Sequence, residues 1–484
     1  MIFTLVLVSA CAVRAASTAT PVPAGPALSL DAYLEQVRAE NLAFHESDET
    51  QRALPLQADE PAVILSPRLD AQGGFTDSRK EPATSLSPPR TIGSRWNVGV
   101  SKLFDTGTNV AFNYGLDYTR LFPPAVPAGL PPAIAAGFFA SQPYFDAAPS
   151  LTVSQSLLRD WRGGNTRAGI LKVRAQAAAA VAAERMRQHQ LILQAEQAYW
   201  NVSLAQELLD AAKSSRDRTE RFVGWTRRKA ALNLAESSDL AQAEAGGELR
   251  ALAVRAAEQD LTAARRTLNA LRNQNGDVVP EKIIRLAAQI AEGGPEIRPD
   301  GARLDIAIAE HALAAAEHAT RMSSFRSMPE LSAFGTLAFN GHDTSGGDAV
   351  TKSFGAQHTA WTVGAAFTMP LDLRFLAHVH AGYEAAERAA QLDVERARTA
   401  AARDWEALRQ RLADVDSRLK LARRIEQAQR NKLEIETRRN RQGRSTLFQL
   451  LAFEEDVSQA QLTRLRFEYE RLLLAAQARF YNGR

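Results

Sequence analysis

Two long stretches of this 484-residue chain contain no proline, and this limits the folds that the chain can adopt. No proline occurs between Ser150 and Val279, and none between Leu371 and the last residue, Arg484. Both stretches are rich in Ala, Leu, Glu, Gln and Arg, the residues that lose least on entering a helix. The sequence therefore predicts two helical tracts much longer than the helices of a globular domain.

Each tract is interrupted once by a residue that tolerates a left-handed backbone. Asn233 interrupts the first and Gly443 the second, 210 positions apart. We expect the chain to reverse at these residues, so that each tract forms an antiparallel helical hairpin with its tip there. The longer arms, at about 167–232 and 377–442, would each span on the order of 95–100 Å.

Apolar residues of the tracts recur in steps of three and four, as in a coiled coil. Such a seam has to be buried against another helix. The clearest example is Trp405, Leu408, Leu412, Val415, Leu419 and Ala422.

The hairpins belong to a predicted two-fold internal repeat. The first copy, 29–273, contains a short helix that begins after Ser29, then strands and the hairpin. A linker follows at 274–300. The second copy, 301–484, contains a helix, two strands and the second hairpin.

The N-terminus, residues 1–16, is typical of a signal peptide, because an apolar run is followed by small residues. The only cysteine, Cys11, lies in a Val-Ser-Ala-Cys sequence that is similar to a lipidation site. Two interpretations stay open at this point. Cys11 is acylated and becomes the first residue of the mature chain, or it is removed with a signal cut near Ala15.

Several segments alternate apolar and other residues, which predicts strands. Asp105-Thr106-Gly107 is typical of a hairpin turn between two of them. The alternation fits a membrane barrel strand and an ordinary half-buried sheet equally well. The segments are 69–75, 96–100, 110–118, 151–158, 331–339 and 361–367.

Composition excludes several classes of function. The net charge of +3 is too small for a nucleic-acid partner, and no run of 18 apolar residues predicts a membrane-spanning helix. The chain contains no phosphate-binding glycine loop and no Gly-x-Ser-x-Gly motif. We therefore expect no catalytic residue, no metal site, no cofactor and no enzyme activity.

These features together resemble the TolC-like outer-membrane efflux proteins. The resemblance covers nearly the whole mature chain and depends on the order and duplication of short motifs rather than on any one of them. The motifs are Leu151 to Asp160, Ala198-Tyr199-Trp200, Asn233 to Ala243, Arg298-Pro299-Asp300, Thr368-Met369-Pro370-Leu371 and Gly443 to Leu450.

The resemblance implies a mixed α/β membrane protein, mostly α. It would be a homotrimer with a β-barrel in the outer membrane, about four strands per chain, continued by a long α-helical coiled-coil barrel in the periplasm. Its partners would be outer-membrane lipid, a periplasmic adaptor (membrane fusion) protein and an inner-membrane pump of the RND, ABC or MFS class. The segment 96–118 is extra to this plan, and either extends the barrel or projects from it.

The resemblance also implies a periplasmic gate near the second tip, where members of the family commonly carry acidic residues. This chain has Gln449 there instead. Asp239 on the first hairpin, Glu454 and Glu455 are the remaining acidic candidates, and a pair between Asp239 and Arg444 would hold the tips closed. The alternative is that the arginines near the tips are solvated or contact the adaptor.

The function implied is an outer-membrane channel of a tripartite efflux or type I secretion system. The alternative is a trimeric coiled-coil stalk or adhesin of the cell envelope without a conducting lumen.

Overall fold

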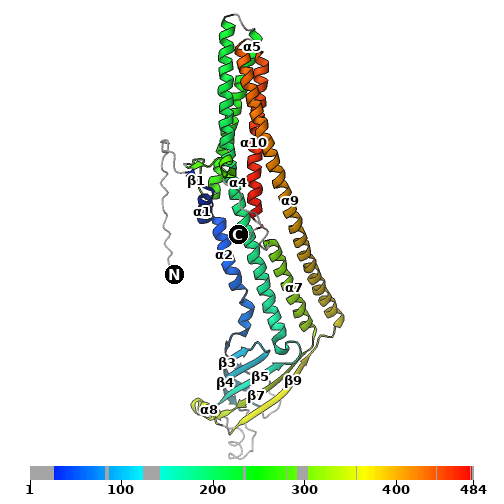
Figure 1. Cartoon of the computed structure of the whole chain (residues 1–484). Helices are drawn as coiled ribbons and strands as arrows, with labels where there is room; N and C mark the ends of the chain where they lie inside the picture. Colours follow the sequence, from blue (N-terminus) through cyan, green and yellow to red (C-terminus); the bar gives the residue numbers. More distant parts are fainter. Residues whose placement is uncertain are drawn as a thin grey trace, which may run out of the picture. The chain divides into compact units, whose positions relative to one another are not determined.

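The protein is described from a computed structural model of the whole chain (Figure 1). The structure describes residues 27–81, 87–123, 142–232, 236–279, 281–291, 303–355, 357–442, 444–479 and 481. The predicted signal peptide with Cys11, the Arg298-Pro299-Asp300 motif, and the tip residues Asn233 and Gly443 lie outside these residues.

The described residues form long helices and one large sheet. The helices are α1 (Leu30–Glu40), α2 (Leu42–Gln57), α4 (Gly164–Ala231), α5 (Ser237–Leu271), α6 (Leu286–Ala291), α7 (Leu304–Ser327), α8 (Gly346–Ser353), α9 (Leu373–Arg441) and α10 (Leu447–Arg479). The strands are β1 (Ala27–Leu28), β2 (Arg68–Ser78), β3 (Arg90–Leu103), β4 (Thr108–Phe122), β5 (Tyr144–Ser156), β6 (Lys282–Ile283), β7 (Glu330–Phe339), β8 (Gly341–Asp343) and β9 (Thr359–Thr368). Two 3-10 turns, η1 (Glu60–Leu65) and η2 (Trp161–Gly163), complete the set.

Two helices have the predicted length. Helix α4 has 68 residues and α9 has 69, and each begins within four residues of the predicted start. Helix α2 contains Pro55 and continues to Gln57. A proline in the last turn removes only one of the helix's hydrogen bonds, so the helix can end two residues later.

The chain divides into two compact units, and each unit combines segments from both predicted repeats. The first unit is helical and includes residues 188–279 and 404–481 with α1. The second contains the sheet and includes residues 47–187 and 303–403. The compact units therefore do not follow the boundaries of the predicted repeats.

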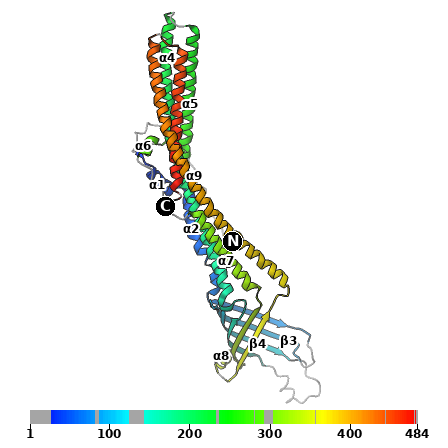
Figure 2. The same cartoon turned by 45° about the vertical axis from the view of Figure 1, so that its right-hand side comes forward.

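In the helical unit, the end of α4, α5, the end of α9 and α10 lie side by side (Figure 2). The predicted seam is buried, since Leu408, Val415 and Leu419 are all less than a tenth exposed. Tyr199 and Trp200 of the family motif lie in the main core, where their rings meet edge-on with centroids 4.8 Å apart. The hydroxyl of Tyr199 donates to the carbonyl of Leu28.

Ser29 caps α1 as predicted, because its hydroxyl accepts a hydrogen bond from the amide of Ala32. Thr446 does the same for α10, since its hydroxyl accepts from the amide of Gln449. On the other side of the second tip, the amide of Arg444 donates to the carbonyl of Arg439, five residues back.

The sheet unit contains an antiparallel sheet of seven strands in the order β2-β3-β4-β5-β7-β9, with β8 paired to β5 off this path. The main path of the sheet therefore has six strands, two more than the four per chain that the resemblance implies for the barrel. The extra hairpin, β3 and β4, pairs with β2 on one side and with β5 on the other. It is part of the sheet rather than a projection from it.

Two glycines allow the turn between β3 and β4 to pack closely against η2. Gly107 has a φ of +76°, and Gly163 of η2, with a φ of +70°, lies against the same turn. A Cβ atom on Gly163 would overlap the carbonyl of Asp105. The sheet and the start of α4 can therefore approach this closely only because both positions lack a side chain.

Candidate functional site

One face of the sheet carries a continuous apolar row. The paired positions cross all six strands of the main path, and every member of the row is exposed to solvent in the single chain. The row consists of Leu69, Val100, Phe112, Leu151, Leu337 and Trp361.

The two neighbouring rows, which project from the opposite face, are polar or small. One consists of Arg68, Ser101, Ala111, Thr152, Thr336 and Thr362, and the other of Asp70, Gly99, Asn113, Ser150, Ala338 and Ala360. In the first of these rows the hydroxyls of Thr152 and Thr336 lie 3.0 Å apart. The sheet is therefore amphipathic, with a solvent-exposed apolar face.

Both outer strands of the sheet have a free edge. In the order of described strands, β2 pairs only with β3, and β9 pairs only with β7. Large apolar side chains on these strands are strongly exposed: Trp361 of β9 is 76% exposed and Phe75 of β2 is 72% exposed. Unpaired edges next to exposed apolar side chains are rare in a soluble monomer and indicate a surface that another chain covers.

The second candidate site lies in the helical unit, where the helix ends flank the two predicted tips. The predicted pair between Asp239 and Arg444 is not formed within the described part of this chain, where Asp239 is half-buried and Arg444 is exposed. Gln449 is exposed, and its side-chain oxygen accepts from the hydroxyl of Ser445. Glu455 of α10 pairs with Arg250 of α5 at 2.5 Å. The Gln459 side chain, followed by that of Arg250, lowers the pKa of the Glu455 carboxyl, while burial opposes the shift.

Glu454 does not fit the predicted role at the gate. Its side chain is fully buried, and the guanidinium of Arg218 on α4 donates to both carboxylate oxygens at 2.7–3.0 Å. The hydroxyl of Ser215 donates to the same carboxylate at 2.9 Å. Glu454 therefore joins α4 to α10 inside the bundle and does not project into an opening.

A second buried ionic network joins α9 to α10. Arg464 donates to Glu426 at 2.5 Å and to Glu468 at 2.6 Å, and Arg423 contacts Glu468 at 2.9 Å. Glu426 and Glu468 are both less than a tenth exposed. Breaking one partner of such a pair leaves a buried charge, so these contacts fix which helices can pack together.

Two other carboxyl groups of the helical unit are shifted toward the neutral form. Burial raises the pKa of Glu196, although Arg479 pairs with it at 2.7 Å and opposes the shift. Burial likewise raises the pKa of Glu207, whose carboxylate accepts from the amide of Leu286 at 2.9 Å. Each group has a structural partner, so neither shift points to catalysis.

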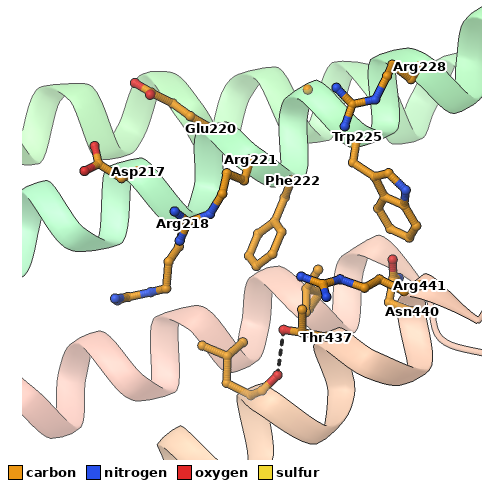
Figure 3. Close-up of a pocket in the computed structure, with 13 residues that line it drawn as sticks. Asp217, Arg218, Glu220, Arg221, Phe222, Trp225, Arg228, Thr437, Asn440 and Arg441 are labelled. Atoms are coloured by element: carbon orange, nitrogen blue, oxygen red, sulfur yellow. Dashed lines mark hydrogen bonds between the residues drawn. The ribbon is translucent and has the colours of Figure 1, made fainter.

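About half of the basic residues near the tips form ion pairs with an acidic residue of the same helix or of a neighbouring helix. Arg227 pairs with Glu244, and Arg438 with Glu434. Lys229 lies 4.0 Å from the ring centroid of Trp225. Arg228 and Arg441, by contrast, line a pocket of about 630 Å³ between the ends of α4 and α9 (Figure 3).

Nothing in the described part of the chain suggests a metal or a membrane-spanning helix. No group of three His, Cys, Asp or Glu side chains there could hold a metal ion. Among the same residues, every helix is too short or too polar to cross a bilayer.

The comparison with known proteins gives a family match in the C-terminal part of the chain. Residues 301–482 match the family described as outer membrane efflux protein. The match covers less than half of the chain, and over these residues the chain is similar to that family. Proteins of this description are outer-membrane channels and not enzymes. No curated protein matches the sequence.

Solved structures share the fold over almost the whole length of the chain. The outer membrane protein VceC from Vibrio cholerae is 14% identical, with 94% of this chain and 96% of that chain covered and a TM-score of 0.66. The outer-membrane channel OprN is 18% identical, with 94% and 89% covered and a TM-score of 0.67. The outer membrane channel CmeC from Campylobacter jejuni is 16% identical, with 94% and 86% covered and a TM-score of 0.63. The predicted fold class, long helices joined to a sheet in an outer-membrane channel fold, is confirmed.

Sequence reasoning missed two parts of the candidate site. It predicted strands but not that six large apolar residues share one row, because the register between strands is not visible in a single strand's pattern. It placed Glu454 near the gate by its distance from the tip. A signal was present, since Leu450, Glu454 and Val457 lie on one side of α10 at steps of four and three, and the first and last are apolar.

Proposed function

We propose that three copies of this chain form an outer-membrane efflux channel, in which the sheets close into one barrel and the helices continue it into the periplasm. The observation that supports this most directly is the apolar row from Leu69 to Trp361. A sheet with one apolar and one polar face suits a barrel wall between lipid and a water-filled lumen.

The free edges support an assembly rather than a lone sheet. An unpaired backbone edge is not tolerated in lipid, where no water can satisfy its amides and carbonyls. In the proposed trimer, β2 of one copy pairs with β9 of the next. The six-strand path then supplies eighteen strands in total, where the four-strand plan supplies twelve.

The number of strands sets the width of the barrel. With strands about 4.8 Å apart and tilted by about 40°, eighteen strands give a diameter of roughly 35 Å, whereas twelve give roughly 24 Å. The extra hairpin of β3 and β4 is thus proposed to widen the outer part of the channel.

The proposed channel works with a periplasmic adaptor and an inner-membrane pump, or exports a polypeptide in a type I secretion system. Only the family likeness supports these partners. We propose that the periplasmic gate is formed by the two hairpin tips, at Asn233 and Gly443. The residues near these tips that would contribute to it are Asp239, Arg444, Gln449 and Glu455. Cys11, if the chain is acylated, would add a lipid anchor.

Native mass spectrometry and electron cryo-microscopy of the purified protein test this assembly. We expect a mass of three chains and a barrel of eighteen strands. A folded monomer would refute the trimer, and a twelve-strand barrel would show that β3 and β4 leave the sheet when the chains assemble. A trimer that never conducts ions would favour the alternative of a structural stalk.

A further inference from the structure

The pocket near the helix ends of the helical unit has the chemistry of an anion-binding site. Its volume is about 630 Å³, within the range of pockets that hold a drug-sized ligand. Figure 3 shows Trp225 and Arg228 extending from α4, and Asn440 and Arg441 lying across from them on α9. Phe222, Leu433 and Leu450 supply its apolar surface.

The charges of the pocket do not balance. Its two acidic residues, Asp217 and Glu220, both pair with Arg216, at 2.8 and 3.3 Å, and Arg216 does not line the pocket. Arg218 pairs with the buried Glu454.

Three arginines then have no acidic partner among the residues that the structure describes. They are Arg221, Arg228 and Arg441. All three line the pocket and are exposed to solvent. Three guanidinium groups around one opening favour an anionic ligand, and a planar carboxylate matches a guanidinium in shape as well as in charge.

A buried acceptor gives a second and independent indication of a ligand. The Asn440 side chain is only 3% exposed, and its amide nitrogen donates to the carbonyl of Ser445 at 2.9 Å. Its side-chain oxygen is buried, with no hydrogen-bond donor in the described part of the chain. A buried acceptor without a donor is costly, so a ligand that supplies a donor is favoured there.

We propose that this pocket binds a hydroxylated aromatic carboxylate. The carboxylate lies among Arg221, Arg228 and Arg441, the aromatic ring packs against Phe222 and Trp225, and the hydroxyl donates to the side-chain oxygen of Asn440. A ligand of this class would pair with the arginines, cover the apolar surface of the pocket and donate a hydrogen bond to the buried oxygen of Asn440.

Isothermal titration calorimetry of the purified full chain with 6-hydroxy-2-naphthoate tests the proposal. We expect saturable binding that weakens by about 10-fold in Arg441→Gln, the loss typical of one charge-assisted hydrogen bond. The matched control is Arg438→Gln on the same helix, where the arginine pairs with Glu434 and does not line the pocket. The control should bind as the wild type does.

Two further compounds separate the parts of the proposal. 2-Naphthoate lacks the hydroxyl and should bind several-fold more weakly, and 6-hydroxy-2-naphthamide lacks the charge and should bind at least 10-fold more weakly. Equal binding of acid and amide would overturn the proposed role of the arginines, and equal binding of the two acids would overturn that of Asn440. Absence of binding to the assembled protein would overturn the site as a whole. Because binding is measured without transport, none of these failures would count against the proposed channel.

Discussion

Replacing Glu454 by glutamine should loosen the helical bundle near its tips. The glutamate is fully buried and accepts three guanidinium contacts of 2.7–3.0 Å from Arg218 and one hydroxyl contact from Ser215. Glutamine keeps the volume and one acceptor oxygen but leaves the guanidinium without a counter-charge.

The size of the effect follows from this geometry. Removing one partner of a buried ion pair costs about 3–5 kcal/mol. Arg218 is 24% exposed and glutamine keeps one hydrogen bond, so we expect a lower cost of about 2–3 kcal/mol. If α4 and α10 open locally, their amides near the pair should exchange roughly 30- to 150-fold faster, since 1.36 kcal/mol is a factor of ten.

Hydrogen exchange followed by mass spectrometry measures this opening directly. Glu470→Gln is the matched control, because Glu470 is exposed on the same helix. The double variant Arg218→Gln with Glu454→Gln should recover part of the protection, because no buried charge is then left unpaired. If Glu454→Gln exchanges no faster than Glu470→Gln, the buried pair does not join α4 to α10 and the reasoning is refuted.

Other predictions concern pH, the sheet turn and the gate. Burial raises the pKa of Glu207 in the folded chain, so protonation of this carboxyl stabilises the folded state at low pH. This stabilisation is lost as the pH rises from 4.5, the ordinary pKa of a glutamate, through the raised pKa of the folded state. Glu207→Gln keeps an acceptor for the amide of Leu286. The Tm of this variant should therefore fall less between pH 4.5 and 7 than the Tm of the wild type, and an equal fall would contradict the prediction. Gly163→Ala should destabilise the sheet unit by on the order of 3 kcal/mol through strain and overlap, seen as a lower Tm, whereas Gly74→Ala, with open space around it, should be nearly neutral. In planar bilayers, Asp239→Ala should lower cation preference by removing three carboxylates from the trimer, and Gln449→Asp should raise it by adding three; unchanged ion selectivity in both would place these residues away from the lumen.

Much of the fold could be predicted because its signals are local. The length of α4 and α9 follows from the absence of proline and the excess of helix-forming residues. The caps at Ser29 and Thr446 depend on hydrogen bonds that span three residues. The buried seam from Leu408 to Leu419 follows from a repeat within one helix.

The parts that could not be predicted depend on contacts between distant segments. All six strands of the main path were predicted as segments, but the place of the extra hairpin was left open. The pairing of β3 and β4 with β2 and β5 is decided by register, which no single segment specifies. The burial of Glu454 depends on Arg218, 236 positions away in the sequence. The pocket at Asn440 and Arg441 likewise needs both α4 and α9 in place.

The central claim is that the assembled chain encloses a water-filled path, and single-channel recording in planar bilayers tests it most directly. Purified trimer, both wild type and Asp239→Ala, should give discrete conductance steps. Trimers that insert into the bilayer yet give no steps in either form would contradict the account and favour a stalk without a conducting lumen.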